Sequence, residues 1–248
     1  MAAITQGPRF LPSGDTALVV EFGDRIDRGL SAAVIDLAER LRVADLGGVT
    51  ETVPTFRSLL VHYDPLATSA ERLIEQISGL IAGPIGDRAA AQASTRLWRI
   101  PACHEAGLAP DLAAVAATTG LTPDEVIALF GAERYHVYMV GFVAGFPYLG
   151  DLPEALRLPR RETPRVQVPA GSVAIAAGMA AVYPYESPGG WHLIGRTPAP
   201  LFDARAEPPA LLRPGDAVLF EPIPKAEFER ITRAVAKHDY ALMPEALA

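Results

Sequence analysis

Three stretches in the second half of the chain, residues 140–150, 159–173 and 183–198, are unusually dense in glycine, proline, arginine and aromatic residues. Glycine lets a backbone approach a ligand closely, and proline stiffens the loop that does so. Arginine offers a planar fork that matches a carboxylate or a phosphate with two hydrogen bonds. These residue types together predict one concave site for a small anion, although the composition alone would also fit the corners of a β-barrel.

We assign substrate binding to three arginines and to four residues beside them: Arg161, Arg165, Arg196, Tyr148, Ser187, Gly189 and Gly190. The short Gly-Arg-Thr-Pro segment around Arg196 should fix the direction of its guanidinium group. The alternative for Arg161 and Arg165 is a solvated pair that bridges carboxylates. The alternative for Tyr148 is packing in the core or in an interface, as for the other aromatic residues of these stretches.

Two titratable groups near these stretches, Glu186 and His136, could move protons and are assigned as catalytic. Glu186 could instead pair with one of the arginines. His136 alternates with Tyr138 along a predicted strand, so their side chains should share one face of the sheet. The alternative for His136 is a structural histidine with its hydrogen bonds satisfied.

Other familiar signatures are absent from the sequence. It has neither a Gly-x-x-x-x-Gly-Lys-Ser/Thr loop nor a Gly-x-Gly-x-x-Gly turn for nucleotides. The five histidines are scattered, so no metal site is expected. Cys103 and His104 do not form a catalytic dyad, because neighbours on a strand point to opposite faces, and Cys103 is expected to be structural.

Composition limits the class of protein. Half of the 248 residues are hydrophobic and 21% are charged, which is typical of a globular protein. The formal charge of -7 argues against a nucleic-acid partner, which would require a basic surface. A single cysteine excludes an internal disulfide and fits a reducing compartment. Without a secretory signal or an apolar run of about 20 residues, we expect a cytoplasmic protein that does not enter a membrane.

Residues 1–83 predict a small α+β domain. Apolar side chains recur every three or four residues over 26–41, which indicates one helix. A second helix is predicted to begin at Thr68, with Glu71 completing a capping box. Short β-type runs at 17–22, 49–53 and 58–63 complete the pattern, so we expect a small sheet covered on one face by two helices.

Residues 84–94 are rich in glycine, alanine and proline and are interpreted as a linker. Beyond them, residues 95–248 predict a second domain in which two helices, at 111–119 and from Thr122, precede many short strands. The strands are broken by proline and glycine and are expected at 135–142, 165–168, 172–177, 191–194 and 217–220. Such a pattern favours a β-barrel or a sandwich, followed by a docking helix at 225–238.

The three stretches resemble the family that contains the B subunit of 5-oxoprolinase, the Kip-type sporulation-kinase inhibitors and the so-called allophanate hydrolase subunit 1. The blocks Glu-Ser-Pro-Gly-Gly-Trp at 186–191 and Gly-Arg-Thr-Pro at 195–198 are its specific features. The segments 53–65 and 211–216 extend the resemblance over nearly the whole chain. It implies an α+β fold, with a small two-helix N-terminal domain followed by a cyclophilin-like β-barrel.

The resemblance also implies a function. The chain would be one subunit of an ATP-dependent 5-oxoprolinase, which opens the lactam of 5-oxoproline to glutamate. A second cyclophilin-like subunit and a third, lactam-opening subunit would be its partners, and ATP, with Mg²⁺, would be bound in the complex. Phosphorylation of the lactam oxygen would create a leaving group, and cationic forks suit the transferring phosphoryl group.

The chain departs from this family's pattern at several positions. Ala144 replaces a proline, Met179 and Ala180 replace a glutamine and a hydroxyl residue, and Phe130 occupies a position where relatives often carry histidine. A site built around lost polar groups would reject its former ligand. A regulatory module of the Kip type, which inhibits a sensor histidine kinase, is therefore one alternative function. A component of a urea- or allophanate-type amidohydrolase, with any biotin on a partner, is another.

Overall fold

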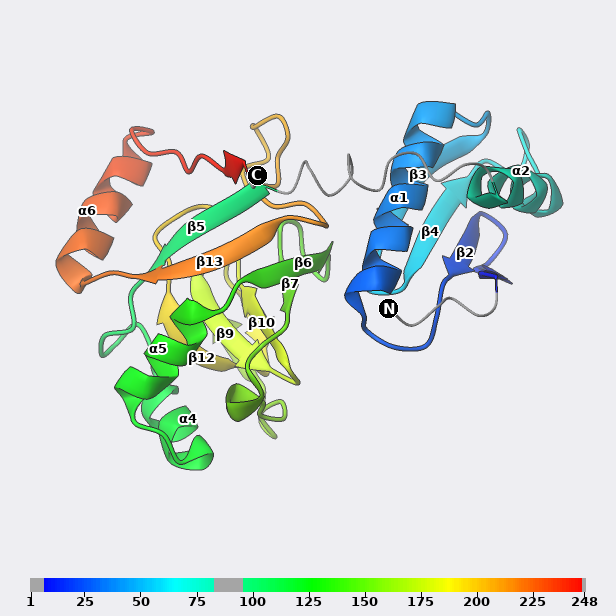
Figure 1. Cartoon of the computed structure of the whole chain (residues 1–248). Coiled ribbons are helices and arrows are strands. Elements are labelled where there is room, and N and C mark those ends of the chain that lie inside the picture. Colours follow the sequence, from blue (N-terminus) through cyan, green and yellow to red (C-terminus); the bar gives the residue numbers. More distant parts are fainter. Residues whose placement is uncertain (1–6, 83–95, 247–248) are drawn as a thin grey trace. The chain divides into compact units, whose positions relative to one another are not determined.

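The computed structural model describes residues 7–82 and 96–246, and the chain divides into two compact units, Met1–Ser94 and Thr95–Ala248 (Figure 1). The linker predicted at 84–94 lies outside the described residues. Unit 1 is an antiparallel sheet in the order β1-β2-β4-β3 together with two helices. The elements of unit 1 are β1 (Arg9–Pro12), β2 (Ala17–Glu21), α1 (Arg28–Ala44), β3 (Val49–Pro54), β4 (Ser58–Tyr63) and α2 (Ala70–Ala82).

Both helices of unit 1 bury their apolar residues against one face of this sheet. Val34 and Leu37 of α1 and Ile77 of α2 share a core with alternate residues of β2 and β4. Helix α1 begins where the Asp27 carboxylate accepts hydrogen bonds from the backbone N–H groups of Gly29 (2.9 Å) and Leu30 (3.1 Å). The sequence pattern of two amphipathic helices on a small sheet is therefore realised as a single hydrophobic core.

The capping box predicted at Thr68 is wrong. Helix α2 begins at Ala70, and the backbone N–H of Arg72 donates to the hydroxyl of Ser69 at 3.3 Å, so Ser69 is the capping residue. The Thr68 side chain instead packs so closely on Gly48 that a Cβ there would lie 2.7 Å from Thr68 Cγ2. Its buried hydroxyl finds no hydrogen-bond partner among the described residues.

Unit 2 is built on a curled eight-stranded sheet in the order β12-β9-β10-β7-β6-β13-β5-β14. All neighbouring strands are antiparallel except β13 and β5, which are parallel. The strands of this sheet are β5 (Arg96–Ala102), β6 (Tyr135–Val140), β7 (Pro147–Gly150), β9 (Ser172–Ala176), β10 (Met179–Val182), β12 (His192–Arg196), β13 (Ala217–Pro222) and β14 (Glu245–Ala246). The remaining elements are α4 (Leu112–Thr119), α5 (Pro123–Ala132), a 3₁₀ turn η1 (Glu154–Leu156), the two-stranded sheet β8 (Arg165–Val168) with β11 (Ser187–Gly189), and α6 (Lys225–Ala236).

The two faces of the curled sheet carry different side chains. On one face, Val173 and Ile175 of β9 join α4 and α5 in the main core, where Phe130 stacks on Phe220 with their ring centroids 4.8 Å apart. On the opposite face, Ala174 and other alternate residues pack against a cluster of aromatic rings. We call this opposite side, with Phe146, Tyr148, Tyr183 and Trp191, the aromatic face.

A buried carboxylate fixes the start of β5. Asp216 is 1% exposed and accepts hydrogen bonds from Arg96 Nε (2.9 Å) and Nη2 (2.6 Å) and from Trp98 Nε1 (3.0 Å). It also accepts the backbone N–H of Arg213 at 3.0 Å. Charge-assisted bonds of this kind are the stronger ones in proteins. Asp216 therefore closes the turn at 213–216 and connects this turn to β5.

The sheet closes on itself through one backbone bridge. Cys103, just after β5, pairs with Arg196 at the end of β12, through N–H to carbonyl bonds of 2.8 and 2.9 Å. With its helices and this bridged, curled sheet, unit 2 has a mixed α+β fold consistent with a cyclophilin-like barrel. His104 follows the bridge, and its Nδ1 lies 2.7 Å from the carbonyl oxygen of Ile194. A Cβ at Gly195 would lie 2.7 Å from that nitrogen, so the bridge requires glycine in the Gly-Arg-Thr-Pro segment.

Burial lowers the pKa of His104, and its hydrogen bond to Ile194 opposes that shift only in part. The neutral ring therefore stabilises the fold above the ordinary histidine pKa of 6.5, and this contribution is lost as the pH falls through the lower folded-state value. We expect His104→Gln to show a shallower loss of stability between pH 7.5 and 5 than the unaltered chain. Urea unfolding followed by tryptophan fluorescence measures this in unit 2, which contains both Trp98 and Trp191.

His238→Asn is the matched control, because His238 has a positive φ of 60°, which asparagine tolerates. This variant should keep the full pH dependence. Parallel pH profiles for His104→Gln and the unaltered chain would contradict the assignment.

Candidate functional site

Two of the three predicted arginines converge on one carboxylate, which the sequence analysis did not select. Asp111 Oδ1 accepts hydrogen bonds from Arg165 Nη2 at 2.6 Å and from Arg161 Nη1 at 3.2 Å. Its Oδ2 accepts the backbone N–H of Leu193 at 2.7 Å, while its own N–H donates to the Leu193 carbonyl at 3.0 Å. Asp111 is 5% exposed. This residue thus joins the start of α4, strand β12 and the loop before β8.

The consequence is that Arg161 and Arg165 already hold an anion supplied by their own chain. Arg161 is further fixed by its backbone N–H, which donates to the Gly190 carbonyl at 2.8 Å. Arg165 Nη1 lies 3.5 Å from the carbonyl oxygen of Trp191. Their geometry is that of a structural clamp, and the shared carboxylate offsets one of their two positive charges.

Arg196 has a different partner. Its Nε donates to the Ala170 carbonyl at 2.7 Å, and its backbone forms the bridge that closes the sheet. Gly171, in the loop that Arg196 holds, has a positive φ of 78°, and a Cβ there would lie 2.3 Å from the Thr197 carbonyl oxygen. The structure therefore does not bring the three arginines to one anion.

The aromatic face consists of side chains that take no part in these arginine contacts. The ring centroid of Phe146 lies 5.1 Å from those of Tyr148 and Tyr183 and 6.1 Å from that of Trp191. The guanidinium carbon of Arg160 lies 5.9 Å from the centroid of Trp191. Phe146, Tyr183 and Trp191 are buried, so Tyr148 is the ring of this group that is partly exposed beside the Arg160 cation.

Both phenols are protonated at neutral pH. Burial raises the pKa of Tyr183 to about 12, against the opposing effect of the Arg160 charge. Burial also raises the pKa of Tyr148, again opposed by Arg160. A protonated phenol can donate a hydrogen bond to an oxygen of a ligand.

Three of the residues predicted to bind substrate, Ser187, Gly189 and Gly190, belong to the segment that passes the Tyr183 phenol. A Cβ at Gly189 would lie 2.1 Å from the Tyr183 hydroxyl, so only glycine lets β11 pass the phenol. Gly190 has more room, with Pro164 3.7 Å from the corresponding position. Ser187 is buried, and its hydroxyl lies 3.5 Å from the Tyr185 carbonyl oxygen. These residues shape the backbone around the aromatic rings.

The two predicted proton-transfer residues lie in different surroundings. Glu186 accepts a hydrogen bond from Gln167 Nε2 at 3.1 Å, and it forms no ion pair with an arginine in the described parts of the chain. The ring of His136 meets that of Tyr138 edge-on, with their centroids 4.6 Å apart, so these two side chains do share a face. The partners described for Glu186 and His136 are therefore not the residues that bind Asp111.

The departures from the family pattern separate in space. Met179 packs against the aromatic face, whereas Ala180 is fully buried in the main core on the other side of β10. Of these two changes, the one to Met179 alters the surroundings of the aromatic rings. Phe130 is also a core residue, and its backbone carbonyl accepts the Tyr135 hydroxyl at 3.1 Å.

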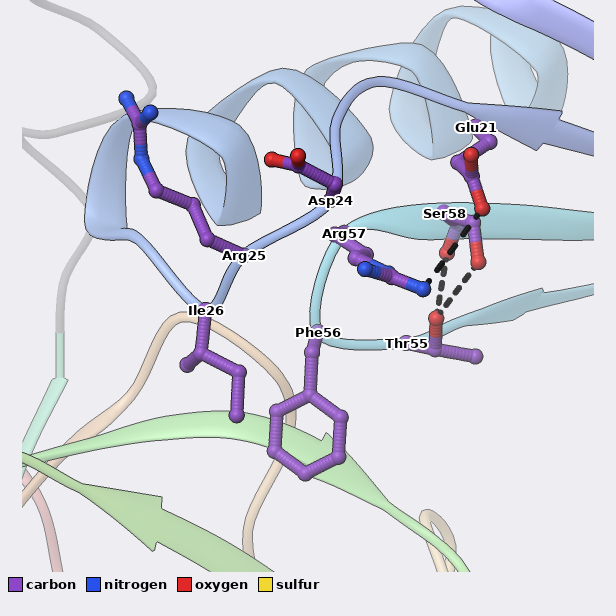
Figure 2. Close-up of a pocket in the computed structure, with 8 residues that line it drawn as sticks. All are labelled: Glu21, Asp24, Arg25, Ile26, Thr55, Phe56, Arg57 and Ser58. Carbon is purple, nitrogen blue, oxygen red and sulfur yellow. Dashed lines mark hydrogen bonds and ion pairs between the residues drawn. The ribbon is translucent and has the colours of Figure 1, made fainter. Parts of the chain in front are cut away.

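Unit 1 contains a separate hollow of about 380 Å³ at the β3–β4 turn (Figure 2). The Thr55 hydroxyl lies 2.9 Å from both the hydroxyl and the carbonyl oxygen of Ser58, which closes the turn. Arg57 lies 3.8 Å from the Glu21 carboxylate. The hollow is lined by Glu21, Asp24, Arg25, Ile26, Thr55, Phe56, Arg57 and Ser58. Its opposite charges compensate one another, so it presents no single ligand chemistry.

A metal site and a membrane-spanning helix are two further possibilities for residues 7–82 and 96–246. No three His, Cys, Asp or Glu side chains in these ranges lie close enough together to hold a metal ion. No single helix there is long and apolar enough to cross a membrane, and only α4 and α5 taken together, bent by 92°, match a span in length and composition.

Known proteins are similar in sequence to this chain over most of its length. Residues 8–212 match the family model described as carboxyltransferase domain, subdomain C and D. The B subunit of 5-oxoprolinase from Bacillus subtilis is 37% identical over 225 residues, which cover 87% of this chain and 92% of that protein. The corresponding protein from Escherichia coli O157:H7 is 39% identical over 84% of this chain and 93% of that protein.

Solved structures are also similar to this chain. The crystal structure of the protein TTHA0988 is 36% identical, with a TM-score of 0.74 over 84% of this chain, which spans only 40% of that protein. Urea amidolyase of K. lactis superimposes over 99% of this chain with a TM-score of 0.80, but it is 19% identical and this chain spans 16% of it. That likeness shows the fold alone.

The Asp111 cluster predicts a measurable coupling. Asp111→Ala should lower the free energy of unfolding by about 3–5 kcal/mol, because it leaves two guanidinium groups and a buried N–H without their acceptor. In a double-mutant cycle, Asp111→Ala and Arg165→Ala should couple by about 1.5–3 kcal/mol. Urea unfolding followed by tryptophan fluorescence provides the measurement.

The exposed pair Asp203 and Arg205, joined at 3.1 Å, is the control for this cycle. Its coupling should stay below about 1 kcal/mol. Equal coupling in the two pairs would show that Asp111 has no special structural role.

Proposed function

We propose that this chain is one subunit of a 5-oxoprolinase. It belongs to the family of the carboxyltransferase domain, subdomain C and D, together with relatives that are B subunits of 5-oxoprolinase. The reaction would open the lactam of 5-oxoproline to glutamate. The observation that carries the proposal is the 37% identity to the Bacillus subtilis protein over 92% of its length. A match over nearly the whole relative supports the same role better than a match to one shared domain would.

The aromatic face suits the substrate of such an enzyme. A five-membered lactam is flat and largely apolar, so it can pack on the partly buried ring of Tyr148, which the buried rings of Phe146 and Trp191 support from within. Its polar atoms can accept hydrogen bonds from a protonated phenol such as Tyr148, which is only partly buried. This chain would then bind and orient the lactam, which is a substantial part of the catalytic effect when two reactants must meet.

ATP and Mg²⁺ fit the described residues of this chain less well. Arg161 and Arg165 share the Asp111 carboxylate, and Arg196 Nε is bound to the Ala170 carbonyl, so each of these guanidinium groups already has a partner within the chain. We propose that the nucleotide and its Mg²⁺ bind elsewhere in the complex.

The proposal requires partner subunits. The relatives from Bacillus subtilis and Escherichia coli are each one subunit of a larger enzyme, and TTHA0988 is more than twice as long as the part that this chain matches. We propose a second, related barrel subunit and a third subunit that opens the lactam. The isolated chain would then have no turnover.

Reconstitution tests this function. The full chain, combined with candidate partner subunits, should hydrolyse ATP only when 5-oxoproline is present and should release glutamate in equal amount. Omission of this chain should abolish both products. An assembled complex that consumes no 5-oxoproline, with a chain that instead binds a sensor histidine kinase, would replace the proposal by the regulatory alternative.

A further inference from the structure

We propose that Arg160 is the residue of this chain that binds the carboxylate of a small cyclic amide lying on the aromatic face. The inference rests on the proposed function, because it assigns one residue to one group of the proposed substrate. Arg160 differs from the three arginines predicted from the sequence, because their guanidinium groups are held by a carboxylate or a carbonyl of the same chain.

The first argument is that Arg160 is available. In the described parts of the chain, its side chain forms neither an ion pair nor a hydrogen bond, and its resolved contact is with the Trp191 ring at 5.9 Å. Arg161 and Arg165, which follow it, are both bound to Asp111. Arg160 is also exposed at the surface, so a ligand can reach it.

The second argument is that its backbone is held in place on both sides. The Leu158 carbonyl accepts the backbone N–H of Ala177 at 2.7 Å, and the Pro159 carbonyl lies 2.9 Å from His192 Nε2. On the other side, the backbone N–H of Arg161 donates to the Gly190 carbonyl at 2.8 Å. An anchored loop loses little further freedom when a ligand binds, which favours affinity.

The third argument concerns the surroundings of the guanidinium group. Its charge opposes the effect of burial on the pKa of both Tyr148 and Tyr183, so it lies near the two phenols as well as near Trp191. A guanidinium group attracted to an aromatic ring keeps its N–H donors free for a carboxylate, because the ring does not accept them as a carboxylate or a carbonyl would.

Together these features match the two ends of one ligand class. The flat ring of a cyclic amide would contact Tyr148, the partly buried ring of the aromatic face, and a carboxylate attached to the ring would receive two hydrogen bonds from Arg160. The 5-oxoproline molecule has both parts, whereas 2-pyrrolidinone has the same ring without the carboxylate. This pair of compounds separates binding by Arg160 from binding by the rest of the face.

The test is made on the assembled complex with Arg160→Gln. The KM for 5-oxoproline should rise roughly 10- to 100-fold, the effect of losing a hydrogen-bonded charge, while kcat changes by less than about threefold. Inhibition by 2-pyrrolidinone should be unchanged. Arg160→Lys should restore part of the lost affinity, because it keeps the charge but not the planar fork.

Arg157→Gln is the matched control, because Arg157 is an exposed arginine of the same loop and lies beside Gly178 rather than the aromatic rings. It should leave KM unchanged. An Arg160→Gln complex with unaltered KM would overturn the proposal while the proposed function stands. An equal loss of affinity for both compounds would show that Arg160 only supports the structure.

Equilibrium dialysis of radiolabelled 5-oxoproline with the same complexes measures the binding affinity independently of turnover. A loss of at least roughly tenfold in affinity with Arg160→Gln supports the proposal even if another step limits the reaction. If the unaltered complex neither binds nor consumes 5-oxoproline, the proposed function fails, and the assignment of Arg160 fails with it.

Discussion

The burial of the Asp111 carboxylate is the constraint on which the arrangement of the second unit depends. A carboxylate away from water must be compensated, and here two guanidinium groups and one backbone N–H do so. Because these donors come from the loop before β8, from the first residue of β8 and from β12, their meeting point sets where that loop crosses the sheet. The loop in turn carries Arg160 to the edge of the aromatic rings.

A second consequence follows from the closure of the sheet. The bridge between Cys103 and Arg196 uses backbone groups, so the barrel is closed without engaging a side chain in that contact. The Arg196 side chain is then free to hold the 169–171 loop through the Ala170 carbonyl. Structural arginines in this unit thus stabilise loops, and ligand binding is left to a residue whose partners are aromatic.

The two sides of one strand explain how the sequence could diverge without losing the fold. Met179 and Ala180 are adjacent, yet they belong to the aromatic face and to the main core respectively. Ala180 must fit a closed apolar space, where a hydroxyl would need a partner. Met179 instead lines the outer cluster, where a flexible side chain can fill an irregular gap and change what the surface binds.

Local patterns alone were enough to predict α1, α4, α5, α6 and most of the strands with recognisable β-type runs, because caps and apolar spacing act over a few residues. The sequence patterns did not predict the strands β1, β5, β7, β10, β11 and β14. For β5 the reason is that its parallel partner β13 lies about 120 residues further along the chain. The capping residue Ser69 was also missed, because the packing of Thr68 on the distant Gly48 is decided by the tertiary structure. The arginine-rich stretches were correctly singled out as unusual, and the family blocks indicated the family. Which arginine meets a carboxylate, a carbonyl or a tryptophan was decided only by the tertiary structure, because Asp111 lies 50 residues before Arg161 and only the curling of the sheet brings it near.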